Sequence, residues 1–217
     1  MQFLICAATE LEIESTKAFI EHHQFAKEKV SILITGVGLT ACTYSLTKAI
    51  VSNRPQFVLQ AGICGSLDSV LAPGDLVVVE NETIGDLGVV EKGSFTSLFA
   101  FNFMNKNEEP WANGHLPNNL SLLRKTSLKI VNGVTVNEIT TDLRRIDFYK
   151  NKLHANIETM EGAALHYVCL KEKIPFLQLR SISNFVGERD KQKWTIKESV
   201  LQLNIELQKM ILKLSGV

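Results

Sequence analysis

The sequence lacks the features that mark disulfide-stabilised, metal-binding and membrane-spanning proteins. Its four cysteines lie in apolar or glycine-rich surroundings without a CxxC pair, so neither a disulfide framework nor a zinc site is predicted. We expect Cys6, Cys42, Cys64 and Cys169 to be small buried hydrophobic residues. No apolar run approaches membrane-spanning length, and the first residues lack the charged lead of a signal peptide. A cytoplasmic protein without a bound metal is therefore expected.

An excess of charge of either sign is also missing. Lys and Arg together number 23, as do Asp and Glu, so the formal net charge is zero. The basic residues are scattered rather than clustered, which argues against nucleic acid or a membrane as a partner. The 217 residues, 45% of them hydrophobic, contain no repeat or linker and predict a single domain spanning 1–217 with a full core.

Apolar stretches and helical patterns alternate along the chain. Strands are predicted at residues 3–7, 30–35, 57–61, 76–79, 128–136 and 176–182, and helices at residues 11–23, 39–53, 160–173 and 195–214. Strands that are apolar throughout and alternate with helices predict an α/β fold, in which a mostly parallel sheet is covered by helices on both faces.

Residues 84–126 are the exception to this alternation. They carry Phe95, Phe99, Phe101, Phe103 and Trp111 among Gly, Asn and Pro, without a clear period. Such a segment fits a lid, an oligomer contact or a buried hairpin, and the sequence does not choose among them.

The first predicted strand is followed by Thr9 and Glu12, which have the spacing of a capping box. In that interpretation Glu12 satisfies a backbone N–H at the start of a helix. Alternatively, Glu12 acts in a site at the carboxyl ends of the strands, where ligands bind in open α/β sheets. The spacing alone supports both interpretations.

Glycine-containing segments follow the next two strands. Residues 36–38, Gly-Val-Gly, form a small loop whose backbone N–H groups are able to face an anion or a water. The loop lacks the third glycine of a dinucleotide fingerprint and the Lys-Ser/Thr of a P-loop, so we exclude both. Residues 61–66 are mostly small and allow a ligand to approach the backbone closely, although a simple turn explains them equally well.

Glu161 lies in the first turn of the third predicted helix. Counted helically, it shares a core-facing stripe with Ala164, Leu165 and Val168. A buried carboxylate needs hydrogen bonds or a counter-charge, and the hydroxyl groups of a ligand meet that need. A first-turn glutamate stabilised by the helix dipole is the simpler alternative. After the last strand, Asn184 is likewise either a ligand contact or a cap.

Six segments follow one another in an informative order and spacing, at residues 8–12, 36–39, 61–67, 73–79, 159–164 and 180–184. Met-Glu-Gly-Ala-Ala at 160–164 and Arg-Ser-Ile-Ser at 180–183 are the most specific parts. With these motifs the chain resembles the nucleoside phosphorylase and nucleosidase superfamily along essentially its whole length. The resemblance implies a three-layer αβα fold with a central mixed, mostly parallel sheet. It also implies a small-molecule nucleoside substrate, no cofactor and a homodimer.

The resemblance assigns roles that the residue chemistry supports. Cleavage of a purine N-glycosidic bond builds positive charge on the ribosyl ring, so the site must hold the sugar, position a nucleophile and hydrogen-bond the departing base. By similarity, Glu161 accepts both ribose hydroxyls, Met160 forms an apolar surface under the sugar, and Glu12 is the general base that activates water. Further substrate contacts are expected from Ile63, Cys64, Gly65 and Thr159.

Asn184 is where the chain departs from the adenine-releasing nucleosidases that it resembles, which have Asp at this position. A protonated Asp donates to N7 and accepts from a 6-amino group, whereas a carboxamide offers N–H donors suited to N7 and to a 6-oxo group. Asn184 therefore favours a 6-oxopurine. The wrong base leaves a buried group unpaired, which costs about 1–3 kcal/mol per group.

Two other activities compete with hydrolysis. Phosphorolysis needs a cationic pocket for phosphate, but the loops at Gly36 and Gly62 contain neither Arg nor Lys, and a carboxylate at Glu12 would repel the anion. A catalytically silent nucleoside-binding protein is the other alternative, but it would be expected to lose Glu12 or Glu161. Hydrolysis is the predicted reaction.

Overall fold

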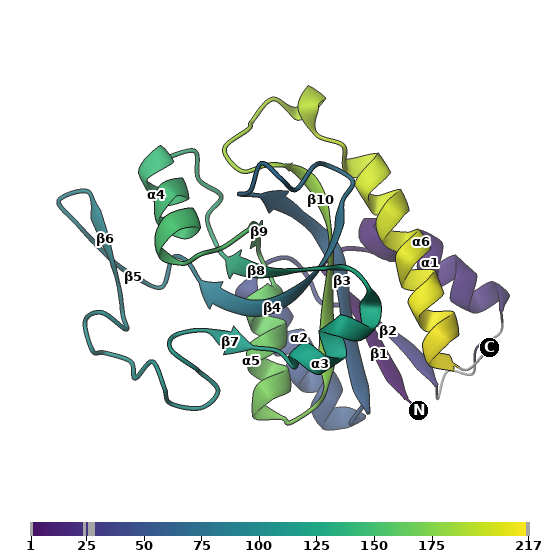
Figure 1. The fold of residues 1–217 in the computed structure, drawn as a ribbon. Coiled ribbons are helices and arrows are strands. Elements are labelled where there is room, and N and C mark those ends of the chain that lie inside the picture. The colour runs from purple at the N-terminus through teal and green to yellow at the C-terminus, as the bar shows by residue number, and fades with distance from the viewer. Residues whose placement is uncertain (1, 24, 26–28, 216–217) are drawn as a thin grey trace.

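A computed structural model describes residues 2–23, 25 and 29–215 of the chain. One sheet of eight strands runs through this part of the molecule (Figure 1). Its strands are β1 (Phe3–Ala7), β2 (Val30–Ile34), β3 (Phe57–Ser66), β4 (Leu76–Ile84), β7 (Leu116–Pro117), β8 (Lys129–Thr135), β9 (Ile157–Thr159) and β10 (Phe176–Phe185).

Five of these strands close into a ring. β10 pairs with β3 on one side and with β4 on the other, and β8 and β9 connect β4 back to β3. β1 and β2 continue the sheet from β3 as an open edge. Within β3, residues 57–60 pair with β1, whereas residues 65–66 pair with β9. The sheet is therefore partly closed, because β3 extends beyond its predicted end and its last residues pair with β9 as well as with β10.

Strand direction follows the prediction. The pairs β1–β2, β1–β3, β3–β10, β4–β8 and β8–β9 are parallel, whereas β4–β10, β3–β9 and β4–β7 are antiparallel. The central mixed, mostly parallel sheet is confirmed. The short strands β7 and β9 were not predicted.

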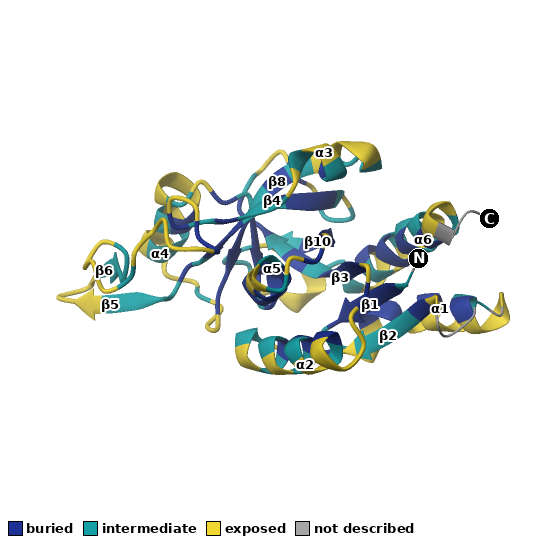
Figure 2. Cartoon of the chain, turned by 90° about the horizontal axis from the view of Figure 1, so that it is seen from below, coloured by how far each residue is buried: buried dark blue, intermediate teal, exposed yellow. Residues whose placement is uncertain are grey.

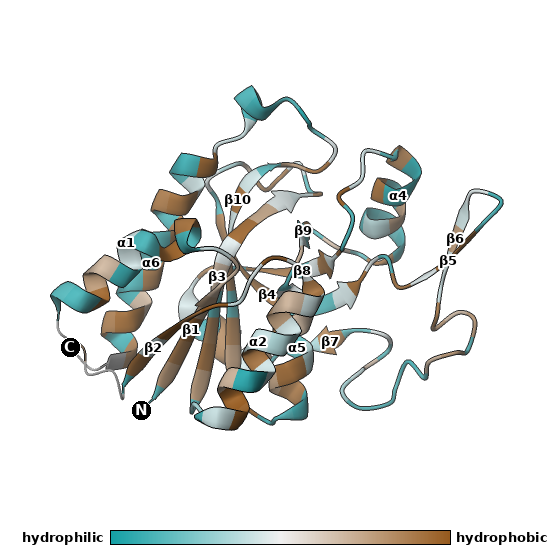
Figure 3. Cartoon of the chain, turned by 180° about the vertical axis from the view of Figure 1, so that it is seen from behind, coloured by the Kyte–Doolittle hydropathy of each residue, from teal (hydrophilic) through white to brown (hydrophobic). Residues whose placement is uncertain are grey.

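Helices cover both faces of the sheet. They are α1 (Glu10–His22), α2 (Leu39–Ser52), α5 (Gly162–Lys171) and α6 (Ile196–Ser215). Phe3 and Ile5 of β1 lie in an apolar cluster with buried residues of α1 and α6, whereas Leu4 and Cys6 lie in a cluster with α2 and α5. Alternate side chains of a strand point to opposite faces, so a strand that is apolar throughout needs a helix layer on each side (Figure 3). The three-layer αβα prediction is confirmed.

The region at residues 84–126 contains a small separate sheet. β5 (Gly88–Glu91) and β6 (Ser94–Ser97) form an antiparallel hairpin that projects from the body of the molecule (Figure 2). None of the hairpin residues is buried, so the buried hairpin is the wrong alternative. The remaining described elements are α3 (Leu120–Leu123), α4 (Leu143–Asp147) and short turns of helix at Arg124–Thr126, Phe148–Lys152 and Lys191–Lys193.

Other predictions are also met. The four predicted helices agree with the structure to within two residues at each end. The cysteines are free and buried, as expected. None of the helices in the described part of the chain is long and apolar enough to span a membrane.

Candidate active site

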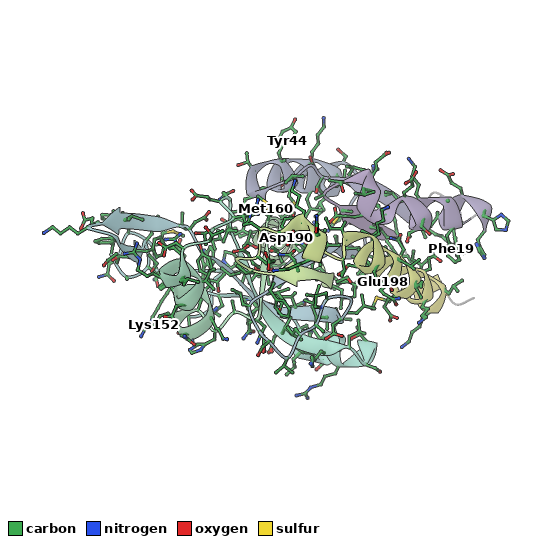
Figure 4. All side chains as sticks on the ribbon, turned by 90° about the horizontal axis from the view of Figure 1, so that it is seen from above. Phe19, Tyr44, Lys152, Met160, Asp190 and Glu198 are labelled. Atoms are coloured by element: carbon green, nitrogen blue, oxygen red, sulfur yellow. The ribbon has the colours of Figure 1, made fainter. Side chains whose placement is uncertain are left out.

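A pocket of about 340 Å³ opens where the ends of β3 and β10 meet the junction of β9 and α5. All eight predicted site residues line it, namely Glu12, Ile63, Cys64, Gly65, Thr159, Met160, Glu161 and Asn184. Seen from above, Met160 lies near the centre of the molecule, between Tyr44 and Asp190 (Figure 4). Residues from distant segments thus meet at one end of the sheet, as the ends of neighbouring strands must.

Glu12 is held at the start of α1 by hydrogen bonds to both carboxylate oxygens. The N–H and the hydroxyl of Thr9 donate to Oε2 at 3.0 and 3.1 Å, and the N–H of Ile63 donates to Oε1 at 3.1 Å. The residue is buried. A carboxylate oxygen accepts more than one hydrogen bond, so the capping interaction and a role in the pocket are compatible rather than exclusive.

Arg180 on β10 belongs to a recognised motif but was given no role from the sequence. Its side chain is 1% exposed, Nη2 donates to Oε1 of Gln60 at 2.7 Å, and Nη1 lies 3.7 Å from Oε2 of Glu161. Gly62 leaves room for it, because a Cβ there would collide with Nη1 and would lie 2.9 Å from Oε1 of Glu12. A charged residue inside an apolar strand was the available signal, since such a charge is buried only when it is paired.

Glu161 is the N-cap of α5, with φ −129° and ψ −11°, and not a residue on the inner face of the helix as predicted. Its carboxylate is nevertheless buried, because Oε1 accepts the N–H of Gly38 at 3.0 Å and Oε2 faces Arg180. Burial raises the pKa of Glu161, while Arg180 and the N–H of Gly38 lower it. The Gly-Val-Gly loop thus directs a backbone N–H at a carboxylate of the protein.

Asn184 follows an irregularity in the register of β10 after Ile182. Its Oδ1 accepts the hydroxyl of Ser183 at 2.7 Å, and Nδ2 donates to the carbonyl of Phe185 at 2.9 Å. The amide nitrogen carries two hydrogens, so one N–H remains for a ligand. Asn184 therefore presents a donor to the pocket, while its acceptor is engaged by Ser183.

Two predicted contact residues direct their polar groups away from the pocket. The thiol of Cys64 donates to the carbonyl of Ser181 at 3.7 Å, and burial raises its pKa to about 12. The hydroxyl of Thr159 lies 3.4 Å from Oε1 of Glu82 and accepts the N–H of Gly162 at 3.3 Å. These two residues contribute surface to the pocket, and their polar side-chain atoms have partners inside the protein.

Glu158 lines the pocket and was not predicted as a site residue. Burial raises its pKa to about 7, and the carboxylate of Asp86 acts in the same direction. Its Oε2 is buried and accepts no hydrogen bond from the residues that the structure describes. Side chains alternate along a strand, so Glu158 and Thr159 of β9 point to opposite faces.

A cation lies beside the glycine-containing loops although these loops contain neither Arg nor Lys. It is Arg180 of β10, whose side chain lies against Gly62. This corrects one premise of the case against phosphorolysis. The guanidinium is nevertheless engaged by Glu161 and Gln60, and Glu12 lies close by. Repulsion by two carboxylates still disfavours a phosphate. Within residues 2–23, 25 and 29–215, no cluster of His, Cys, Asp or Glu is arranged to hold a metal ion.

The chain belongs to the phosphorylase superfamily, whose family model matches residues 4–215. Among its relatives, the futalosine hydrolase of Thermus thermophilus is 27% identical over 187 residues, which cover 85% of this chain and 82% of the relative. The 5′-methylthioadenosine/S-adenosylhomocysteine nucleosidase of Buchnera aphidicola is 24% identical over 204 residues, with coverage of 85% and 84%. Both names denote nucleosidases, and the matches do not separate them.

Solved structures confirm the fold. The native futalosine hydrolase of Helicobacter pylori superposes with a TM-score of 0.81 at 20% identity and covers 98% of each chain. The 5′-methylthioadenosine/S-adenosylhomocysteine nucleosidase of the same organism gives a TM-score of 0.81 at 21% identity, covering 98% of this chain and 99% of the other. The nucleoside phosphorylase-like architecture expected from the sequence is therefore correct.

Proposed function

We propose that this protein is a cytoplasmic hydrolase that cleaves the N-glycosidic bond of futalosine, releasing hypoxanthine and dehypoxanthine futalosine in menaquinone biosynthesis. The hydrogen bonds of Asn184 carry the proposal, since this pocket-lining residue keeps one N–H for a ligand while Oδ1 accepts from Ser183. A 6-oxopurine presents acceptors at N7 and O6, which match that donor. The sequence at 84–88 and at 184–190 also looks most like futalosine hydrolase, and proteins of that name are among the relatives.

The proposed reaction uses the two fixed carboxylates. Glu161 accepts the ribose hydroxyls, and Glu12 takes a proton from a water below C1′. The water oxygen bonds to C1′ as the C1′–N9 bond breaks, and the electron pair of that bond passes into the purine. Asn184 donates to N7 and stabilises the charge that develops there. The carboxamide has no proton to transfer, so the base takes its proton from Glu12 or from solvent.

The main alternative is a 5′-methylthioadenosine/S-adenosylhomocysteine nucleosidase, the name of other relatives. That activity releases a 6-aminopurine, whose amino group needs an acceptor, whereas the unengaged group of Asn184 is an N–H donor and Oδ1 already accepts one hydrogen bond from Ser183. A purine nucleoside phosphorylase is disfavoured by the two carboxylates beside Arg180. A non-catalytic nucleoside-binding protein would not need Glu12 held in the pocket.

The test is to incubate the protein with futalosine, inosine and methylthioadenosine, with and without phosphate, and to identify the released base and sugar. Hypoxanthine and dehypoxanthine futalosine, formed from futalosine at the same rate with and without phosphate, are the expected products. Release of adenine from methylthioadenosine alone, or of a sugar phosphate, would contradict the proposal.

We also propose that the protein is a homodimer. Tyr44 and Val51 on α2 are 67% and 71% exposed, and Tyr167 on α5 is 38% exposed. With Met104 and Trp111 they line one apolar groove. An apolar surface of this kind is typical of a protein contact, and it makes residues 84–126 an oligomer contact. No residue of that segment lines the candidate active site of the same chain.

Sedimentation velocity tests this proposal. The wild type is expected to sediment as a dimer and Tyr44→Glu as a monomer, because the substitution places a charge on the apolar groove. A monomeric wild type would contradict the proposal.

A further inference from the structure

The helix α5 begins without the side-chain cap that an N-cap residue often supplies. Glu161 occupies the N-cap position, but within the described chain its side chain accepts no hydrogen bond from the first turn of α5. The carboxylate instead accepts the N–H of Gly38 at 3.0 Å and faces Arg180. The first N–H groups of a helix have no partner inside the helix, so a buried helix end needs acceptors from elsewhere in the protein.

Two threonine hydroxyls from neighbouring strands are those acceptors. The N–H of Ala163 donates to Oγ1 of Thr135 at 2.8 Å. The N–H of Gly162 donates to Oγ1 of Thr159 at 3.3 Å. Thr135 ends β8 and Thr159 ends β9, the two residues are paired in the sheet, and their hydroxyl oxygens are 3.0 Å apart. The ends of two adjacent strands thus cap the helix.

Glu82 on β4 fixes the direction of the two hydroxyls. The hydroxyl of Thr135 donates to Oε2 of Glu82 at 2.8 Å, and the hydroxyl of Thr159 lies 3.4 Å from Oε1. Nε2 of Gln178 also donates to Oε1, at 2.8 Å. A hydroxyl carries one hydrogen, so a hydroxyl that donates to the carboxylate turns its lone pairs toward the N–H groups of the helix.

The surroundings of Glu82 are shaped to hold a carboxylate. Glu82 is fully buried, and a Cβ on Gly162 or on Gly133 would collide with it. Burial raises the pKa of Glu82 to about 7, while the hydrogen bonds from Gln178 and Thr135 lower it. Of the residues that the structure describes, Glu82 is not among those that line the pocket. Its effect on a ligand therefore passes through the groups that it holds.

We propose that Glu82, Thr135 and Thr159 cap α5 in place of Glu161 and thereby leave the Glu161 carboxylate free to bind the ribose hydroxyls. The inference rests on the proposed function and deepens it. An N-cap side chain ordinarily accepts the N–H of the second or third helical residue, and Ala163 is the second residue of α5. Without the threonine hydroxyls, Glu161 would turn toward that N–H and away from the sugar. The three residues act through Glu161 and are positioning residues.

The test compares two uncleavable ligands, whose binding to the full chain is measured by calorimetry. Carbocyclic inosine keeps both ribose hydroxyls, and its 2′,3′-dideoxy counterpart lacks them. In both, a CH₂ group replaces the ring oxygen, so the positive charge that cleavage requires is not stabilised. Thr135→Val keeps the size of the side chain and removes the hydroxyl. We expect it to weaken binding of the hydroxylated ligand about tenfold and that of the dideoxy ligand by less than about twofold.

Thr135→Ser restores the hydroxyl and should recover most of the preference for the hydroxylated ligand. Thr126→Val is the matched control. The hydroxyl of Thr126 donates to the carbonyl of Leu123 at 2.7 Å and accepts the N–H of Leu128 at 3.2 Å, but it lies in the short turn of helix after α3. Both valine variants lose a hydroxyl that a backbone N–H needs, so both should lower Tm. Only Thr135→Val should change the ratio of the two affinities.

Two substitutions examine the carboxylate itself. Glu82→Met removes both acceptors, and we expect the ratio to fall at least as far as in Thr135→Val. Glu82→Gln keeps a carbonyl that accepts from Thr135, and Gln178 is able to turn its amide to accept the new N–H, because its Oε1 has no partner among the described residues. Glu82→Gln should therefore keep the ratio within about threefold of the wild type.

Equal weakening of both ligands by Thr135→Val, unchanged binding of the hydroxylated ligand, or an equal change of the ratio in Thr126→Val would each overturn the inference. A wild type that does not favour the hydroxylated ligand would overturn it as well. A wild type whose preference for the hydroxyls is lost in Thr135→Val, but which hydrolyses no nucleoside, would refute the proposed function and leave this inference intact.

Discussion

The two sides of the pocket are held in different ways. On the sugar side, Glu12 and Glu161 are fixed by backbone N–H groups, with Arg180 beside them. On the base side, Asn184 has a free N–H and Glu158 has an unpartnered oxygen. Fixed groups suit the part of the reaction that all purine nucleosides share, and groups with unused hydrogen-bonding capacity suit the part of the substrate that varies. The proposed function thus assigns reaction and specificity to different walls of one pocket.

The largest effect should come from the sugar side. Glu12→Gln is expected to lower kcat by roughly 10² to 10⁴ and to leave substrate affinity within a few fold, because it removes the general base. Steady-state kinetics and calorimetry measure the two quantities. Glu14→Gln is the control, since Glu14 is exposed on the same helix. Near wild-type turnover by Glu12→Gln would mean that Glu12 is not the general base and only contributes to the capping box of α1.

Glu161→Gln should weaken affinity and rate together. The substitution removes the charged acceptor of two hydroxyls and the partner of Arg180, so kcat/KM should fall by about 10- to 100-fold. Ligand binding and steady-state kinetics, compared on the same protein, provide the check. Unchanged affinity would argue against a ribose contact of Glu161, and this side of the pocket would then lose its assignment to the sugar.

On the base side, Glu158 should make stability depend on pH. Its folded-state pKa of about 7 lies above the ordinary value of 4.5, so the folded protein binds its proton more readily than the unfolded chain does. Stability from this group is therefore greatest at low pH and declines as the pH rises from about 4.5 to about 7. Urea unfolding at several pH values should show that Glu158→Gln removes about 3 kcal/mol of this decline. The same slope in both proteins would mean that Glu158 is not buried and unpartnered.

Asn184→Asp should change selectivity rather than only activity. The ratio of kcat/KM for futalosine to that for aminodeoxyfutalosine should shift toward the amino compound by on the order of tenfold, about 1.4 kcal/mol. Absolute activity should fall for both substrates, because the pocket is not built to keep an aspartic acid protonated there. An unchanged ratio would show that another residue reads the base.

Much of the architecture was accessible from the sequence because its signals are local. Apolar runs, helix periods and the capping-box spacing gave the α/β alternation and the ends of most elements. Closure of the ring was not accessible, because it depends on β3 pairing with β1, β9 and β10 along different parts of its length. The small residues at the end of β3 were predicted to be either a simple turn or a segment that a ligand approaches closely; they continue the strand, and residues 63–65 line the pocket.

The same division applies to the pocket. Glu12 and Asn184 were predicted for the site because each follows a predicted strand, and Glu161 because it lies in the first turn of a predicted helix inside a recognisable motif; all three line the pocket. Arg180 and Glu158 were missed because their roles depend on neighbours from other strands. The capping geometry of Glu161 likewise depends on where α5 begins, two residues later than the helical pattern indicated.

The account is tested most directly by kcat/KM of the wild type for futalosine and for aminodeoxyfutalosine, measured side by side. The two substrates share the sugar and tail and differ at the purine, so the ratio isolates the base side of the pocket. We predict a preference for futalosine, because the free N–H of Asn184 meets acceptors at both N7 and O6 of the oxopurine, whereas an aminopurine offers it only N7 and places amino hydrogens at position 6. Equal cleavage of the two, or a preference for the amino compound, would contradict the assignment of base specificity to this wall.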